Sequence, residues 1–150
     1  MYRHEQPSQR RPFLITAFQN KLFAVDRMTG AIRWRLELGG GNAYKGNRTI
    51  VELAIDSDVV IALTATYIGF ISYTSGELLR ELHLEPGSKM TSSPTLLIEG
   101  GQLFVTGSGS VVCYSMSGDR LWEQAFDGEG YGDTAVGFPG VVRQANDRIG

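Results

Sequence analysis

The sequence offers few side chains at spacings that could support catalysis or metal binding. Asp56 and Asp58, with Glu52 upstream, could form a calcium site or an acid/base set, because carboxylates serve in both. The two aspartates flank a serine where a hairpin turn is expected, and aspartate is common in turns because its side chain hydrogen-bonds the local backbone. We therefore predict solvated turn residues rather than ligands.

The histidines and the glycine-rich segments are equally uninformative about chemistry. His4 lies in an unpatterned N-terminal stretch, and His83 alternates with leucines, as expected on the solvent side of a strand. The segments at residues 39–41 and 128–132 resemble fragments of phosphate-binding loops, but neither opens a helical pattern that could hold a phosphate. The sequence predicts no catalytic residue, no metal site and no cofactor, and hence a protein that is not an enzyme.

The composition is that of a single folded domain. The chain has 150 residues, 42% of them hydrophobic, with 19 glycines and 10% aromatics, which suits short strands and tight turns. The net charge of −2 supplies no basic field for nucleic acid. Cys113 is the only cysteine, so neither an internal disulfide nor a CxxC site can form. No apolar run reaches the about 18 residues that span a bilayer, so we expect a cytoplasmic protein with no membrane partner.

An internal repeat organises the chain. Three segments, each an apolar strand, a polar turn ending in Thr-Gly or Ser-Gly and a second strand, align without gaps on Gly30, Gly76 and Gly118. The glycines are 46 and 42 residues apart. A four-stranded antiparallel blade needs about 40 to 45 residues, so the period predicts the blades of an all-β propeller.

Further strands are predicted upstream of each aligned pair. Branched and aromatic runs bounded by turn residues predict strands at residues 13–18, 49–55, 59–64, 95–98 and 103–107. The first blade lacks a first strand, because residues 1–11 are polar and unpatterned. We predict a flexible arm over residues 1–11, then one domain over 12–150 with blades at about 12–38, 49–84 and 94–126. A closing strand is predicted at about residues 140–146, with 141–144 as an orphan first strand.

The first repeat resembles a known blade signature. Residues 24–30 read Ala-Val-Asp-Arg-Met-Thr-Gly, and Trp34 follows the glycine by four positions. This resembles the A-x-D-x-x-T-G-x-x-x-W signature of pyrroloquinoline-quinone-like (PQQ-like) β-propeller repeats. The resemblance implies that Trp34 packs between neighbouring blades and that the Thr-Gly turn joins the last two strands of a blade.

The other two repeats depart from the signature. The second has Ser72 for the aspartate and Arg80 for the tryptophan, and the third keeps Trp122 but has Tyr114 for the aspartate. The resemblance covers roughly residues 12–126. It does not extend to the quinoprotein dehydrogenases, which require about eight blades, a calcium-bound cofactor on the propeller axis and adjacent cysteines. Fold does not imply activity.

A three-bladed arc leaves two open blade faces, so we expect it to associate. The favoured arrangement is a homodimer that closes a six-bladed ring, with the closing strand of one copy completing the first blade of the other. A larger ring, or another protein of a larger assembly, is the alternative. We expect a non-catalytic scaffold or protein-interaction module, or alternatively a lectin-like or small-molecule-binding propeller. The resemblance places the blade-to-blade loops on one face, which gives these candidate partner-binding residues: Tyr44, Lys45, Asn47, Arg48, Lys89, Tyr131 and Asp133.

Overall fold

The structure is a computed structural model, and each regular element of its described residues is a β-strand. It describes residues 11–39, 49–64, 67–83, 95–107, 109–129 and 135–143. No helix in these ranges is long and apolar enough to cross a membrane. The predicted arm falls almost wholly outside the described residues.

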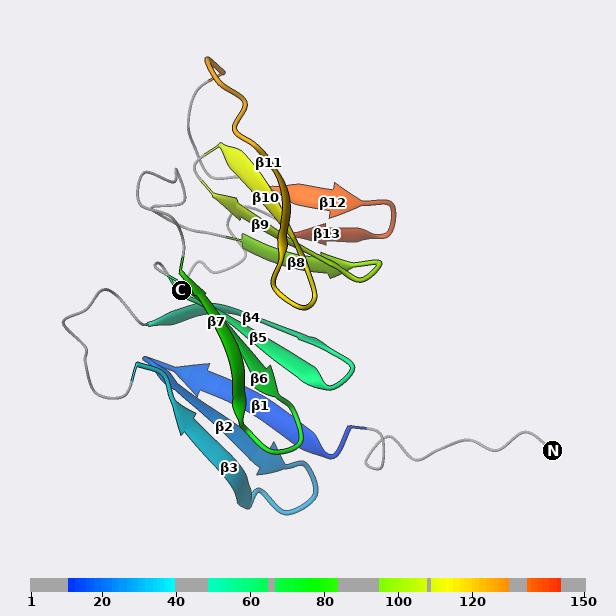
Figure 1. Cartoon of the computed structure of the whole chain (residues 1–150). Helices are drawn as coiled ribbons and strands as arrows, with labels where there is room; N and C mark the ends of the chain where they lie inside the picture. Colours follow the sequence, from blue (N-terminus) through cyan, green and yellow to red (C-terminus); the bar gives the residue numbers. More distant parts are fainter. Residues whose placement is uncertain are drawn as a thin grey trace.

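The strands form three stacked antiparallel sheets and a hairpin (Figure 1). The first sheet has the order β1 (Phe13–Phe18), β2 (Lys21–Asp26), β3 (Ile32–Glu37). The second contains β4 (Ile50–Asp56), β5 (Val59–Thr64), β6 (Tyr67–Ser72) and β7 (Leu78–His83). The third contains β8 (Thr95–Glu99), β9 (Gln102–Gly107), β10 (Ser110–Ser115) and β11 (Arg120–Gln124). The hairpin is β12 (Val136–Phe138) and β13 (Val141–Arg143).

These sheets confirm the predicted fold class of antiparallel propeller blades. Among the described residues, the first sheet has three strands and no counterpart of β4 and β8, which are the first strands of the other two sheets. Strands β1 and β5 have the predicted bounds, and β4, β8 and β9 differ from theirs by one residue at one or both ends.

Three apolar layers hold the stack together. One lies between the first and second sheets and includes Leu22, Trp34 and Tyr67. A second lies between the second and third sheets and includes Phe70 and Leu103. In the third layer, Val136 and Val141 of the hairpin pack on Leu97, Phe104 and Cys113 of the third sheet. Each sheet is therefore held mainly by its neighbour's face, as in a propeller.

The C-terminal prediction needs a correction. Residues 141–144 were expected to form a lone first strand, but Val141–Arg143 pairs with Val136–Phe138, and residue 144 lies outside the described ranges. Pro139 and Gly140 join the two strands, and Gly140 has φ +84°. Proline followed by a glycine at positive φ favours a tight two-residue turn, which folds β13 back on β12. β13 contacts the innermost strand β8, while Phe138 of β12 lies 5.3 Å from Phe104 of β9, between ring centroids.

Candidate functional site

The candidate partner-binding residues from the sequence cannot be placed. All seven of them, Tyr44, Lys45, Asn47, Arg48, Lys89, Tyr131 and Asp133, lie outside the described residues. Two other features of the described residues are candidates for function: the contacts between neighbouring sheets and the exposed faces at the ends of the stack.

Trp34 docks on the turn of the second sheet. Trp34 is only 8% exposed, and its Nε1–H donates a hydrogen bond of 2.8 Å to the backbone carbonyl of Tyr73. A Cβ added at Gly76 would lie 2.6 Å from the indole ring. Glycine is therefore needed at this position both for its φ of +78° and for the close approach of Trp34.

Arg80 makes the equivalent contact between the second and third sheets. Its Nη1 donates to the carbonyl of Ser117 and lies 3.6 Å from a carboxylate oxygen of Asp119. A Cβ at Gly118 would lie 3.0 Å from the Arg80 side chain. Arg80 lies opposite Phe70 on the neighbouring strand, and Trp34 lies opposite Ala24 at the equivalent position of the first sheet. An arginine therefore occupies in the second sheet the docking position that a tryptophan occupies in the first.

Backbone hydrogen bonds in the turns correct the alignment of the third repeat. The N–H groups of Asp26, Ser72 and Ser115 donate 2.8 Å bonds to Ala31, Glu77 and Asp119, respectively. The residue equivalent to Asp26 is therefore Ser115, and not Tyr114 as the gapless alignment predicted. The third turn is one residue shorter, and Tyr114 packs in the core between the second and third sheets.

The polar residue at this turn position accepts backbone hydrogen bonds. Asp26 Oδ1 accepts from the N–H groups of Met28 at 2.8 Å and Thr29 at 3.1 Å. The hydrogen bond from Met28, with smaller contributions from Thr29 and Arg33, holds the pKa of Asp26 below its usual value. Ser72 Oγ accepts from Ser75 N–H at 3.3 Å.

A third docking residue, Trp122, is 45% exposed. It pairs with Cys113 and ends a cross-strand row that runs Leu97, Phe104, Cys113, Trp122. The hairpin covers the first three members of this row, and the Trp122 ring lies 6.1 Å from Phe104. Within the described part of the chain, Trp122 at the outer end of this row is therefore only partly covered.

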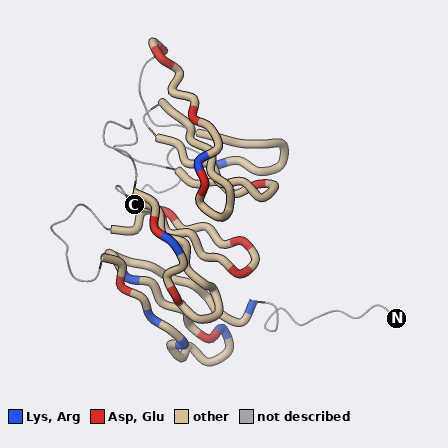
Figure 2. Tube along the Cα trace, viewed as in Figure 1, with Lys and Arg blue, Asp and Glu red and all other residues tan. Residues whose placement is uncertain are grey.

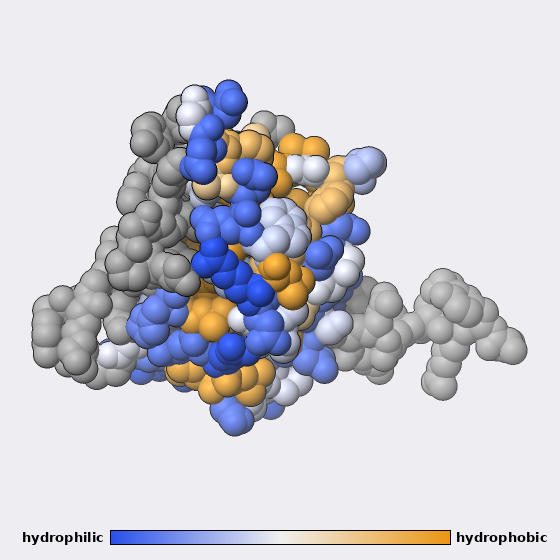
Figure 3. Space-filling view, turned by 45° about the horizontal axis from the view of Figure 1, so that its top comes forward, coloured by the Kyte–Doolittle hydropathy of each residue, from blue (hydrophilic) through white to orange (hydrophobic). Residues whose placement is uncertain are grey.

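The opposite end of the stack is an open sheet face, which we call the first-sheet face. Its exposed members are Leu14 at 63%, Phe18 at 55% and Ile32 at 62%. Phe23 and Val25 lie between them, and the Phe18 and Phe23 rings stack 5.3 Å apart. Figure 3 shows apolar side chains reaching the surface at both ends of the stack. The sequence analysis did not predict these residues as an exposed surface. In the structure, burial alternates along β1, whereas β5 has a sheet on each side and is almost continuously buried.

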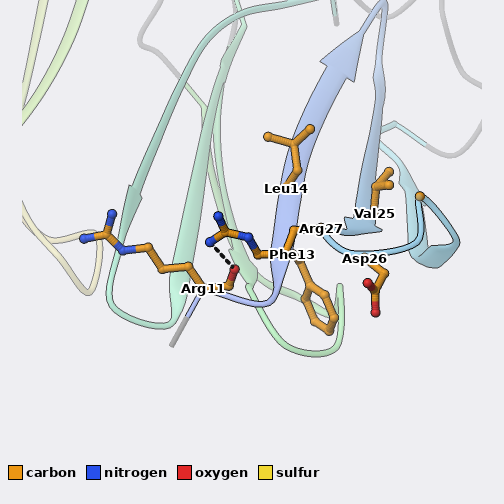
Figure 4. Close-up of a pocket in the computed structure, with 7 residues that line it drawn as sticks. Arg11, Phe13, Leu14, Val25, Asp26 and Arg27 are labelled. Atoms are coloured by element: carbon orange, nitrogen blue, oxygen red, sulfur yellow. Dashed lines mark hydrogen bonds between the residues drawn. The ribbon is translucent and has the colours of Figure 1, made fainter. Parts of the chain in front are cut away.

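A pocket of about 560 Å³ opens beside the turn of the first sheet (Figure 4). Its lining combines apolar and charged residues, namely Arg11, Phe13, Leu14, Val25, Asp26, Arg27 and Gly30. The Arg27 guanidinium donates a 3.4 Å hydrogen bond to the Arg11 carbonyl. Gly30 is exposed, and a Cβ placed on it would meet nothing within 4 Å.

Charge is distributed unevenly along the stack (Figure 2). Residues 11–39 carry five Arg or Lys and two Asp or Glu. Residues 95–129 carry one Arg and five Asp or Glu. The end of the stack that bears the first-sheet face is therefore basic, and the third sheet is acidic.

Neither the acidic residues nor His83 gathers into a metal site in the described ranges, where no group of three potential ligands occurs. Asp56 and Asp58 flank a turn at Ser57, which has φ +52°. Glu52 is buried and ion-paired, with its Oε1 2.7 Å from Nη2 of Arg143. His83 is exposed at the end of β7, as predicted, and His4 lies outside the described residues.

No protein-family model matches this sequence, and no curated protein sequence matches it either. Solved structures do match. BamB from Moraxella catarrhalis is 23% identical with a TM-score of 0.55, over 75% of this chain and 33% of BamB. Quinohemoprotein alcohol dehydrogenase from Comamonas testosteroni is 14% identical with a TM-score of 0.61, over 76% and 26%. Apo AztD from Citrobacter koseri is 15% identical with a TM-score of 0.61, over 79% and 33%.

At these identities the likeness establishes the fold alone. The chain has the fold of PQQ-type β-propeller proteins, as its repeat predicted. It spans a third or less of the length of the solved structures named here. The described sheets are therefore blades of a β-propeller fold.

Proposed function

We propose that this protein is a non-catalytic propeller scaffold that works by binding another protein through the ends of its sheet stack. The observation that carries the proposal is the first-sheet face, where Leu14, Phe18 and Ile32 are each more than half exposed. In the second sheet, Val60 and Ile71 are the equivalents of Leu14 and Val25 on this face, and both are fully buried against the first sheet. Exposed large apolar side chains gathered on one sheet face are typical of an interaction site on a soluble protein.

The favoured partner is a second copy of the chain. Closed propellers have about four to eight blades. The described residues form three sheets and a hairpin, so two copies related by a two-fold axis would give a ring of six blades. In that ring the first-sheet face of each copy lies against the third sheet of the other. The alternative partner is a different protein that supplies the remaining blades of a larger assembly.

The solution mass tests this proposal directly. Light scattering of the purified chain, across a range of concentrations, should give about twice the chain mass of 16.4 kDa. A larger multiple would favour a larger ring. A folded monomer at all concentrations would contradict self-association and leave only a different partner.

A further inference from the structure

The two sheet-to-sheet contacts inside the chain share one geometry. A side chain on the last strand of one sheet, Trp34 or Arg80, lies over the turn glycine of the next sheet. The docked glycines, Gly76 and Gly118, are buried. Each contact also includes a hydrogen bond from the docking side chain to a backbone carbonyl of that turn.

The first sheet carries the same turn without an occupant among the described residues. Gly30 N–H donates to the Asp26 carbonyl at 2.8 Å, as Gly76 N–H donates to the Ser72 carbonyl at 2.9 Å. Arg27 N–H donates to the Pro12 carbonyl at 2.9 Å, and the equivalent bond from Tyr73 N–H measures 2.7 Å. The receiving turn is therefore already formed, and the pocket of Figure 4 opens beside it.

The third sheet carries the complementary side chain. Trp122 has the same cross-strand register as Trp34 and Arg80, and follows its turn glycine by the same four residues. It is the same residue type as Trp34 but is 45% exposed, whereas Trp34 is 8% exposed. Burial of an indole ring at the centre of an interface is a common source of binding energy.

Charge favours a second copy as the source of this tryptophan. The sheet that bears the receiving turn is basic, with Arg11, Arg27 and Arg33 near it, while Trp122 is followed by Glu123 and Asp127 on an acidic sheet. Joining the third sheet of one copy to the first sheet of another brings opposite charges together.

On the basis of the proposed self-association, we propose that Trp122 of one copy docks on the Asp26–Gly30 turn of a second copy. Its indole N–H donates to the backbone carbonyl of Arg27, as that of Trp34 donates to Tyr73 within the chain. In a two-fold dimer this contact occurs twice, once at each junction.

The contact requires one rearrangement of the hairpin. By analogy with the stacking inside the chain, β1 of the second copy would lie over β9, where β12 lies in this structure. β13 then pairs with β1 in place of β12. The exchange replaces a strand of three residues by one of six, so the number of possible ladder hydrogen bonds does not fall.

Two variants test the two sides of the contact. Trp122→Ala removes the docking ring, and Gly30→Asn places a side chain in the receiving turn, at a positive φ that asparagine tolerates. Leu79→Ala is the control for the first, because it truncates a similarly exposed apolar side chain on β7, in the middle sheet rather than at either end of the stack. Gly101→Asn is the control for the second, because Gly101 has φ +77° and nothing within 4 Å of its Cβ position.

Analytical ultracentrifugation should show dimerisation weakened at least about tenfold in each variant and unchanged in each control. Circular dichroism and thermal unfolding of each variant confirm that it is folded. A mixture of the two variants should form dimers at concentrations where neither does so alone, because the mixed dimer retains one intact junction. A direct contact between two Trp122 rings would give no such rescue.

The outcomes separate this inference from the function on which it rests. A wild-type protein that stays monomeric overturns self-association and the docking contact together. A wild-type dimer that Trp122→Ala and Gly30→Asn leave intact overturns only the docking contact. A loss in both variants without rescue on mixing also overturns it.

Discussion

At the scale of single residues, the docking position on the last strand of a sheet accepts different side chains if they can donate a hydrogen bond to the turn of the next sheet. Trp34 and Arg80 both reach a carbonyl of the next turn, one with an indole N–H and the other with a guanidinium. The first turn position needs an acceptor oxygen for backbone N–H groups, which Asp26 and Ser72 supply from a carboxylate and a hydroxyl. The two acceptors differ in one physical respect, because only the aspartate titrates.

Removing the charge of Asp26 should therefore have a pH-dependent effect. Hydrogen bonds to the carboxylate lower its pKa below the usual 3.8 in the folded state, so its ionised form favours folding above that value. This stabilisation disappears as the pH falls through the folded-state pKa. Asp26→Asn should lower the midpoint of urea unfolding at pH about 7, and the difference from the wild type should shrink at pH about 2.

Ser72→Ala provides the matched control. The Ser72 hydroxyl holds the equivalent turn and does not titrate, so its loss should lower the unfolding midpoint by a similar amount at both pH values. An Asp26→Asn effect that is equally large at low pH would show that the charge does not contribute.

At the scale of elements, the C-terminal hairpin contains a strand that the sequence pattern does not predict. The segment predicted as a lone first strand contains β13, which pairs with β12 instead. β12 is only three residues long and contains Gly137, so no alternating pattern identifies it. Its strand character depends on packing over Leu97 and Phe104 rather than on local propensity. The ion pair that ties β13 to the stack, Arg143 to Glu52, joins residues 91 positions apart and leaves no local signal.

The Arg143 contacts should control how often the hairpin opens, with Cys113 as the reporter. Cys113 is fully buried in the layer beneath the hairpin, and burial raises the pKa of its thiol, so it should react slowly. Arg143→Ala removes hydrogen bonds to Glu52 and to the Leu96 carbonyl. A loss of about 1.5–3 kcal/mol would raise the rate of Cys113 labelling by a thiol reagent at least about tenfold.

Lys21→Ala, on β2 in the first sheet at the opposite end of the stack from the hairpin, is the control and should leave the labelling rate unchanged. Labelling in denaturant should be equally fast for all three proteins. An unchanged native-state rate in Arg143→Ala would show that other contacts hold the hairpin.

At the scale of the whole molecule, the sequence predicted the sheets but not the surface that they expose. The turn glycines and their spacing identify three blades, because in every blade the turn before the last strand contains a glycine at positive φ. Leu14 and Val60 are equivalent apolar residues on β1 and β5, yet one is 63% exposed and the other fully buried. Which of them is covered depends on the neighbouring sheet, and a strand's own residues carry no information about that neighbour.

The uneven charge of the stack should make self-association sensitive to salt. Raising NaCl from about 0.01 M to about 1 M shortens the Debye length from about 30 Å to about 3 Å, which screens the attraction between the basic first sheet and the acidic third sheet. We expect the association rate measured by stopped-flow light scattering to fall by about tenfold or more. Replacing Arg33 and Arg35 with glutamine should flatten this dependence, while Glu81→Gln on the second sheet should not. A rate that does not respond to salt would mean that apolar contact alone brings the copies together.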